Sequence, residues 1–396
     1  MEVVAESVAG IDVHQKEITV TVLIGSAESA KPKKVHARFQ TVTFDLKACG
    51  AWLKQQDVKQ VLMESTGQYW RPVWQILEPF GFNMILCNPR IIKNIPGKKT
   101  DQKDSEWLSE LARYGLVSAS YVPPRQIQEL RESTRLSKSI TQQMTRLKNQ
   151  VHDILQRSNI KLTTYVSDIF SGSGRRILAL LENGEVINLA NIEQAGTGKR
   201  GYRLKATPKQ ILASLDGALS YNDRFLMAMN MNLLASYQRE LINLESRIYE
   251  QLEAFSELYH RLQAIPGVGE GTAQIIIAEI GSDVSPFPDA HHLASWAGLC
   301  PGSYESAGKK HGAHTLHGNK YLKTALITAA MAAKSTKQTG LRDFYWRLCS
   351  RMGKQKANVA LAHKLLRIIY VMIQTGATYQ EYKKSQRTED TLTPKI

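Results

Sequence analysis

Four carboxylates within the first 104 residues have the types and spacing that suit metal-dependent cleavage of a phosphodiester. They are Asp12, Glu64, Asp101 and Asp104. Carboxylate oxygens are the ligands that hard cations such as Mg²⁺ take. Two Mg²⁺ ions about 4 Å apart stabilise both the attacking and the leaving oxygen in phosphodiester chemistry. The quartet therefore predicts a Mg²⁺ site that acts on nucleic acid.

Different secondary-structure elements must position these four side chains. Asp12 and Glu64 each follow a short apolar run that is typical of a buried strand. Asp101 and Asp104 open a predicted helix with Thr100 as its N-cap, and their i, i+3 spacing puts both on one face. Taken singly, each carboxylate also has a purely structural interpretation as a turn residue or a cap. Their order within one α/β unit favours the catalytic interpretation.

The N-terminal part, residues 1–124, alternates short apolar runs with amphipathic ones. The patterns predict strands over 7–13, 18–24, 35–41, 58–63 and 82–87, and helices over 43–55 and 69–80. Strands that alternate with helices after an opening hairpin imply a mixed sheet covered on both faces. This is the pattern of an RNase H-like domain, an analogy of fold that does not fix function.

Two long amphipathic helices are predicted over 125–160 and about 224–262, on either side of an insertion at 161–223. Apolar residues of the first helix alternate steps of four and three, as in a coiled coil. These residues are Ile140, Met144, Leu147, Val151 and Ile154. The two helices could pair with each other or with another protomer, so 125–262 is a candidate dimerisation region. The other faces of the first helix carry basic side chains that we expect to contact nucleic acid, namely Arg131, Arg135, Lys138, Arg146 and Lys148.

The charge of the chain is concentrated toward its C-terminus. The net charge is +15, yet residues 1–120 hold 15 Lys and Arg against 13 Asp and Glu. Residues 301–370 hold 13 Lys and Arg against only Glu305 and Asp343. Such an imbalance indicates a surface that binds phosphates.

A glycine-rich turn at 264–273 adds a second predicted contact with nucleic acid. Gly267 and Gly269 stand between two predicted helices in the pattern of a helix-hairpin-helix, whose backbone N–H groups hold a DNA phosphate. The alternative is a tight turn without a ligand. The predicted nucleic-acid contacts are Gly267, Gly269, Lys309, Lys310, Lys320, Arg351, Lys354 and Lys356.

The four cysteines are scattered, which argues against a disulfide framework or a zinc site and fits a reducing cytoplasm. No signal peptide or long apolar run is present, so we expect neither secretion nor a membrane span. A cytoplasmic location is the expectation.

The assembled motifs resemble those of transposases of the insertion sequence 110/1111 family, the bridge-RNA-guided recombinases, over nearly the whole chain. In the N-terminal part these are Gly10-Ile-Asp12, Met63-Glu64-Ser-Thr-Gly67-Gln-Tyr69-Trp70 and Lys99-Thr-Asp101-Gln-Lys-Asp104. In the C-terminal part they are Ile265-Pro-Gly-Val-Gly269, Ala297-Gly-Leu-Cys-Pro301, Tyr304-Glu-Ser306-Ala-Gly308 and Gly318-Asn-Lys320.

The resemblance implies roles for both halves of the chain. The quartet would be the acidic (DEDD) metal site of an RNase H-like domain, and Ser306 the nucleophile of a mostly helical transposase domain over 263–396. The sequence departs from the family pattern at Ala307, which leaves Ser303 as an alternative nucleophile. The implied partners are a structured bridge RNA and target and donor double-stranded DNA. Family members assemble as tetramers, so a dimer of dimers is implied here.

Two other functions stay open from the residues. A junction-resolving nuclease would use the acidic site with water as nucleophile and would not need Ser306. A nucleic-acid-binding scaffold would keep salt-dependent binding and show no cleavage that depends on divalent cations. A serine hydroxyl is a weak nucleophile and needs activation, and Ser306 has no obvious triad beside it in the sequence. The acidic site is therefore the expected source of that activation.

Overall fold

The structure is a computed structural model and forms two compact units, Met1–Val122 and Pro123–Ile396. It describes residues 3–26, 28, 31–65, 67–89, 101–198, 201–202, 204–302, 305–306, 309–310, 315, 317–337 and 339–392.

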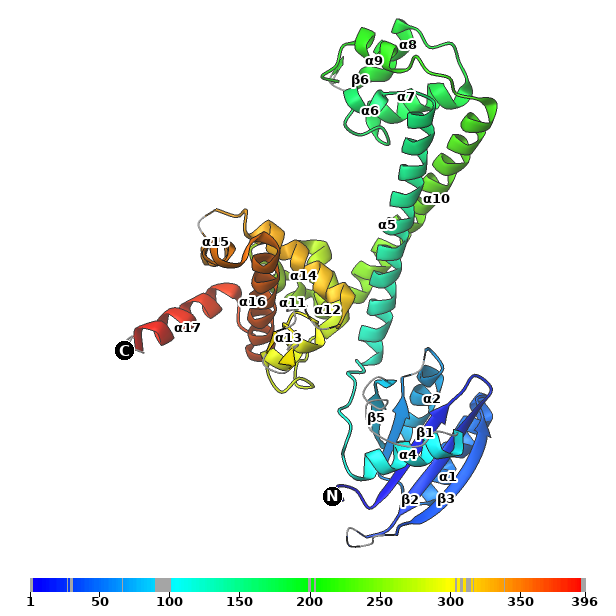
Figure 1. Ribbon diagram of the computed structural model, residues 1–396, viewed down its shortest axis with the longest axis vertical. Helices are drawn as coiled ribbons and strands as arrows, with labels where there is room; N and C mark the ends of the chain where they lie inside the picture. Colours follow the sequence, from blue (N-terminus) through cyan, green and yellow to red (C-terminus); the bar gives the residue numbers. More distant parts are fainter. Residues whose placement is uncertain are drawn as a thin grey trace. The chain divides into compact units, whose positions relative to one another are not determined.

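The N-terminal unit is built on one mixed sheet of five strands (Figure 1). The strands are β1 (Ser7–Val13), β2 (Glu17–Ile24), β3 (Lys33–Gln40), β4 (Gln60–Glu64) and β5 (Asn83–Cys87). The helices are α1 (Thr43–Gln55), α2 (Trp70–Leu77), the 3-10 helix η1 (Glu78–Phe80) and α4 (Asp101–Arg113). The order β3-β2-β1-β4-β5 combines an antiparallel half, β1 to β3, with a parallel half, β1, β4 and β5. The predicted mixed sheet is confirmed, as are the predicted strands and helices apart from small shifts of their ends.

Strand β1 lies in the middle of the sheet and is buried on both faces. Ile11 and Met63 belong to the core on the face of α1 and α2. Val8 and Leu62 belong to the core on the opposite face, under Leu108 of α4. Edge strand β3 instead alternates exposed and half-buried residues, because only one of its faces is covered.

Helix α4 lies directly on β1 because that strand has a glycine at the contact. A Cβ on Gly10 would meet the backbone O of Ser105 and the backbone N of Ser109, each at 2.3 Å. A buried hydrogen bond of 2.7 Å joins the hydroxyls of Thr21 and Ser105 across the same interface. The Arg113 guanidinium donates hydrogen bonds to the carbonyls of Glu6, Gly25 and Ser26. These contacts therefore fix the distance of α4 from the sheet and the direction in which the helix runs.

We expect Gly10→Ala to destabilise the N-terminal unit by roughly 1–3 kcal/mol, because α4 would have to move outward to admit the methyl group. Chemical denaturation followed by circular dichroism measures the change. Gly271→Ala is the matched control, since a Cβ at Gly271 meets nothing within 4 Å. An unchanged free energy of unfolding for Gly10→Ala would show that the contact between α4 and β1 is looser than described.

The second unit is mostly helical. It comprises α5 (Arg125–Arg157), α6 (Leu162–Tyr165), α7 (Gly172–Asn183), α8 (Leu189–Gly196), β6 (Thr197–Gly198), β7 (Gly201–Tyr202), α9 (Pro208–Ser214), α10 (Tyr221–Leu252), the 3-10 helix η2 (Glu253–Phe255), α11 (Ser256–Gln263), α12 (Glu270–Ile280), α13 (Ala290–Trp296), β8 (Glu305–Ser306), β9 (Lys309–Lys310), α14 (Lys320–Ala333), α15 (Gly340–Met352), α16 (Lys354–Thr375) and α17 (Tyr379–Leu392).

Helices α5 and α10 lie side by side along their length (Figure 1). Val151 and Ile154 of the predicted apolar face are buried with Leu234 of α10, so the alternative in which the two helices pair within one chain is confirmed. Between them in the sequence, α6 to α9 form a small helical cluster on the same core. The prediction of one helix over 224–262 is wrong at its end, because α10 stops at Leu252 and η2 separates it from α11.

The remaining helices, α11 to α16, pack around a core to which α12, α14 and α16 contribute. Ile276, Leu326 and Leu365 are fully buried there. Among the residues that the structure describes, no helix is both long and apolar enough to cross a membrane.

Candidate active site

Asp12 and Glu64 are placed side by side at the carboxyl edge of the sheet. Ile11 pairs with Met63 in the parallel β1–β4 ladder, and the next residue on each strand is a carboxylate. Neighbouring strands run about 4.8 Å apart, and matching positions of parallel strands point to the same face. That face is covered by α4, because Leu62, two residues before Glu64, lies in the core beneath this helix.

Helix α4 begins at the same edge. Its last residue, Arg113, binds carbonyls beside the start of β1, and the middle of the helix packs on Gly10. The helix therefore runs antiparallel to β1. Its first turn, which holds Asp101 and Asp104, lies toward the end of β1 that carries Asp12. The fold thus brings all four predicted positions to one edge of the sheet.

The side chains of three quartet members are described, namely those of Asp12, Glu64 and Asp104, and each is half-buried. The Asp101 side chain and Thr100, the predicted N-cap, lie outside the described residues. Among the described side chains, no three His, Cys, Asp or Glu residues are grouped closely enough to hold a metal ion. The role of the quartet as metal ligands therefore stays a prediction.

Two residues that sequence reasoning did not select lie beside these carboxylates. His14 Nε2 is 3.0 Å from Asp12 Oδ2, and the Asp12 side chain is only 18% exposed. The sequence did hold one signal for His14. It stands two residues after Asp12 at the end of a predicted strand, and this i, i+2 spacing puts both side chains on one face. Cys87 pairs with Glu64 in the β4–β5 ladder, and burial together with the Glu64 charge raises the pKa of its thiol to about 12. Cys87 is therefore a neutral thiol that donates to the carbonyl of Met63.

Ser306 lies in a short antiparallel hairpin of the second unit. It pairs with Lys309, and Glu305 pairs with Lys310. The hairpin backbone thus places Lys309 directly opposite the predicted nucleophile and Lys310 at the neighbouring position. The alternative nucleophile Ser303 lies outside the described residues, as do the side chains of the hairpin.

Contacts between residues on either side of Ser306 hold the two ends of its segment close together. Pro301 and Thr315 form an isolated antiparallel bridge. Gly318 packs so closely on Gly298 that a Cβ on Gly318 would lie 2.3 Å from the Gly298 backbone N. Two motifs that are 20 residues apart in the sequence are therefore joined in space, and together they hold the ends of the segment between them.

A buried carboxylate, Glu279, links the end of this segment at Asn319 to the long helix α5. Its side chain is 1% exposed and accepts two hydrogen bonds of 2.8 Å from the Arg135 guanidinium. Arg131 lies 3.3 Å from the same carboxylate and donates to the Glu279 carbonyl. Asn319, the N-cap of α14, donates to Glu279 Oε2 at 2.6 Å. The expectation that Arg131 and Arg135 serve as nucleic-acid contacts needs correction, because both cations are engaged in holding α5 against α12.

We expect Glu279→Ala to lower the free energy of unfolding by roughly 2–4 kcal/mol, because it leaves the guanidinium groups of Arg131 and Arg135 without their carboxylate partner. The loss is smaller than for a fully buried pair, since the Arg135 side chain is 35% exposed. Chemical denaturation measures it. Glu250→Ala removes an exposed i, i+3 pair with Arg247 and should change stability by less than about 0.5 kcal/mol. Equal effects of the two substitutions would contradict the role given to Glu279.

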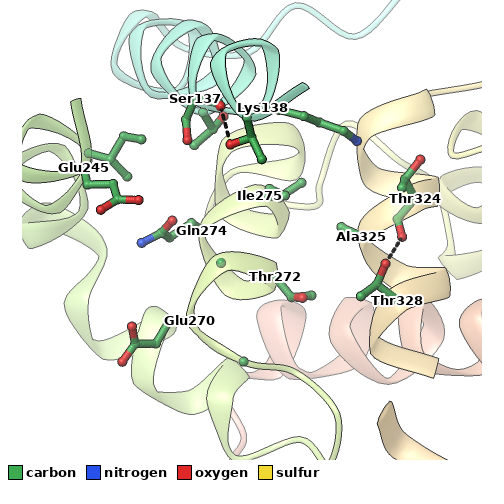
Figure 2. A pocket seen from close by; sticks show the side chains of 15 residues that line it. Ser137, Lys138, Glu245, Glu270, Thr272, Gln274, Ile275, Thr324, Ala325 and Thr328 are labelled. Atoms are coloured by element: carbon green, nitrogen blue, oxygen red, sulfur yellow. Dashed lines mark hydrogen bonds between the residues drawn. The ribbon is translucent and has the colours of Figure 1, made fainter. Parts of the chain in front are cut away.

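The predicted helix-hairpin-helix corresponds to the turn between α11 and α12. Gly267 has a φ of +90°, and a Cβ there would lie 2.3 Å from the backbone O of Ala329, so this glycine serves packing against α14. Gly269, the N-cap of α12, has open space where a Cβ would stand. A cavity of about 510 Å³ lies beside it, with Lys138 and Thr324 on one side and Glu245 on the other (Figure 2).

The remaining predicted contacts are surface cations of the second unit. Lys320 opens α14, and its Nζ lies 5.2 Å from the centre of the Tyr321 ring. Arg351 lies in the last turn of α15, while Lys354 and Lys356 lie in the first turn of α16, and all three are exposed. Their positions are compatible with phosphate contacts.

Two family models match the chain, and they correspond to its two ends. An IS110-type DEDD model, described as "Transposase", matches residues 9–160. A second model, "Transposase IS116/IS110/IS902 family", matches residues 259–346. The first match spans the acidic quartet and the two arginines that bind Glu279, and the second spans Glu279, Asn319 and the Ser306 hairpin.

Similar proteins agree with these matches. The transposase for insertion sequence element IS1111A of Coxiella burnetii is 24% identical over 331 residues, which cover 81% of this chain and 79% of that protein. An uncharacterized protein of insertion element IS110 from Streptomyces coelicolor is 36% identical over 140 residues, or 34% of its length. A pilin gene-inverting protein of Moraxella bovis is 31% identical over 148 residues, or 45% of its length. The chain thus aligns with less than half of these last two relatives.

The match to the first family model, which spans the mixed sheet and the carboxylate edge, places the chain in the DEDD transposase class. The chain belongs to the insertion sequence 110/1111 family of transposases, which confirms the resemblance found in the sequence.

Proposed function

We propose that this protein is a transposase that cuts and rejoins DNA strands under the guidance of a structured bridge RNA. The observation that carries the proposal is the placement of Asp12 and Glu64 on adjacent strand ends, at the edge where α4 begins. Family membership supports the class of reaction. The pilin gene-inverting relative is named for an inversion, which also requires strands to be cut and rejoined.

The chain divides into three functional parts in this proposal. Residues 1–124 form an RNase H-like domain, 125–262 a coiled-coil region that also brings protomers together as a dimer of dimers, and 263–396 the serine-bearing transposase domain with its helix-hairpin-helix. The strand order with β1 at its centre supports the first assignment. The packing of α5 on α10 supports the coiled-coil part of the second, while assembly of protomers rests on the family resemblance.

The acidic quartet has the donor chemistry that suits Mg²⁺. Asp12, Glu64, Asp101 and Asp104 would hold the ion, because four carboxylates at one sheet edge repel each other and attract a hard cation. When bound, Mg²⁺ supplies stabilisation of the charge that develops on the phosphate oxygens. His14 keeps the Asp12 carboxylate oriented through its hydrogen bond.

Ser306 supplies the attacking oxygen in this proposal. Its Oγ forms the bond to phosphorus as the bond to the 3′ oxygen of the cut strand breaks, and the displaced strand takes up a proton. Lys309 and Lys310 stand across the hairpin, where they bind the scissile phosphate or its neighbours. Gly267 and Gly269 place the N-terminus of α12 against the DNA backbone. Lys320, Arg351, Lys354 and Lys356 add phosphate contacts that are independent of sequence.

A reconstituted reaction tests this function. Purified protein, Mg²⁺, donor and target plasmids and an RNA transcribed from the DNA flanking the gene should yield joined donor–target junctions, which sequencing detects. We expect no junctions when the RNA is omitted or when a chelator is in excess. Junctions that form equally well without RNA would contradict the guidance, and cut but unjoined DNA would favour a junction-resolving nuclease.

A further inference from the structure

A small basic pocket lies in the second unit. The residues that line it follow the Ser306 hairpin in the sequence. It has a volume of about 320 Å³ and opens where the end of α14, the first turns of α15 and the start of α16 meet. Its lining comprises Lys334, Ser335, Lys337, Arg342, Tyr345, Trp346 and Lys354. Of these residues, only Lys354 belongs to the contacts proposed above.

The pocket gathers positive charge without compensation. Lys334, Lys337, Arg342 and Lys354 contribute four cations, and no carboxylate is among its described lining residues. The nearest acidic residue along the chain, Asp343, is exposed in the first turn of α15, where it complements the helix dipole. Within the described part of the chain, none of the four cations is held in an ion pair. Like charges around a small hollow repel each other, so the pocket favours an anion such as a phosphate.

An aromatic platform stands beside these cations. Trp346 is 52% exposed, which is unusual for so large an apolar side chain. Tyr345 beneath it is 1% exposed and meets the indole edge-on, with ring centres 5.2 Å apart and an interplanar angle of 77°. Lys334 Nζ lies 5.1 Å from the centre of the Tyr345 ring. Tyr345 thus packs against the Trp346 indole, while much of the indole surface stays exposed to solvent.

Cations next to an exposed, supported aromatic ring form the combination that binds unpaired nucleotides. The cations follow the phosphates, and a base stacks on the ring. A base within a duplex cannot stack in this way, since both its faces are already covered by its neighbours. A pocket of about 320 Å³ also admits one nucleotide and not a double helix.

We propose that this pocket, which we call the Trp346 pocket, binds one nucleotide of a single strand. The base stacks on Trp346, and Lys337, Arg342 and their neighbours hold the adjacent phosphates. The inference rests on the proposed function, because strand cleavage and exchange require unpaired strands. The phosphodiester chemistry is shared by single-stranded DNA and single-stranded RNA, and the two are separated by the experiment.

Binding of labelled oligonucleotides to the full-length protein tests the proposal. The probes are oligothymidylate, oligouridylate and a duplex of oligothymidylate with oligodeoxyadenylate. Trp346→Ala should weaken binding of a single-stranded probe roughly 5- to 150-fold, the range for loss of one stacked base. Duplex binding should change by less than about twofold. Whichever single-stranded probe shows the loss identifies DNA or RNA as the ligand.

Matched variants separate stacking from other effects. Trp346→Phe keeps a ring and should restore most of the affinity. Tyr221→Ala removes an aromatic side chain that is 84% exposed but lies outside the pocket, and should bind all probes as the wild type does. The double variant Lys337→Gln, Arg342→Gln should reduce the slope of log K against log[salt] by about 0.7 for each lost contact. Lys209→Gln, at an exposed lysine of α9, should leave the slope unchanged.

Two results would overturn the proposal. One is single-strand binding by Trp346→Ala that equals wild type, and the other is an equal loss for duplex and single strand. Melting temperatures of the variants show whether they are folded. If Trp346→Ala is not folded, the double variant Lys337→Gln, Arg342→Gln decides, because an unchanged salt dependence of its single-strand binding would also overturn the proposal. Metal-dependent DNA cleavage by the wild type is measured separately. Cleavage with unaltered binding by Trp346→Ala rejects only the pocket, whereas selective loss of single-strand binding without any cleavage rejects only the proposed function.

Discussion

Replacing Ser306 with alanine is expected to abolish DNA strand cleavage and to leave nucleic-acid binding nearly unchanged. The substitution removes the attacking oxygen, and with it the covalent route. Binding survives because one hydroxyl contributes little beside many phosphate contacts. Cleavage of end-labelled DNA on a denaturing gel measures the first effect, and a mobility shift with RNA and DNA measures the second.

The wild-type protein should form a protein-linked DNA strand during this reaction. Attack by the serine joins the strand to the protein as a phosphoserine ester, which conserves the bond energy so that the strand can be rejoined without ATP. On a denaturing gel, this species should migrate slowly and should disappear after digestion with protease. The species should be missing from Ser306→Ala.

Ser303→Ala is the matched control for the departure from the family pattern at Ala307. It should cleave DNA and form the protein-linked strand as the wild type does. If Ser303→Ala is inactive while Ser306→Ala is active, the nucleophile is Ser303. If both variants cut DNA and no linked strand forms, water is the nucleophile and the protein acts as a metal-dependent nuclease.

Asp12→Asn is expected to reduce strand cleavage by at least roughly hundredfold, because the cation that Asp12 would hold supplies electrostatic stabilisation of the reacting phosphate. The amide keeps the shape of the side chain and loses the negative charge that binds the cation. Asp104→Asn should act in the same way, because the first turn of α4 lies at the same edge. Rates of cleavage over a range of Mg²⁺ concentrations measure the loss.

Asp57→Asn is the control for the loss of one negative charge from the same unit. Asp57 is exposed and lies just before β4, at the amino edge of the sheet, and its φ of +52° is one that asparagine also adopts. This variant should keep full activity. All three variants should remain folded and bound to RNA. Full cleavage by Asp12→Asn, or cleavage by the wild type in excess chelator, would show that the carboxylates are structural.

The sequence determined the elements of the N-terminal unit because their signals are local. Alternating and continuous apolar runs were enough to predict β1 to β5, α1 and α2, and they placed Asp12 and Glu64 at the ends of strands. The parallel pairing of β1 with β4, which brings these two strand ends together, is given by the structure. Local signals also misled. The residues from 224 to 262 favour a helix throughout, yet η2 interrupts it at Glu253–Phe255 so that α11 can pack on α12. Packing of this kind overrides propensity and leaves no mark within a short window of sequence.

The tertiary structure alone decided which charges are free to bind nucleic acid. In the sequence, Arg131 and Arg135 are indistinguishable from other cations of the same helix. The fold pairs them with Glu279, a residue more than 140 positions away, so that their charges are compensated within the protein. It likewise gathers Arg342 and Lys354 around the exposed Trp346. Residue types and spacing thus determined the chemistry available to this chain, whereas contacts between distant segments decided which groups can perform it, because burial and pairing depend on neighbours in space.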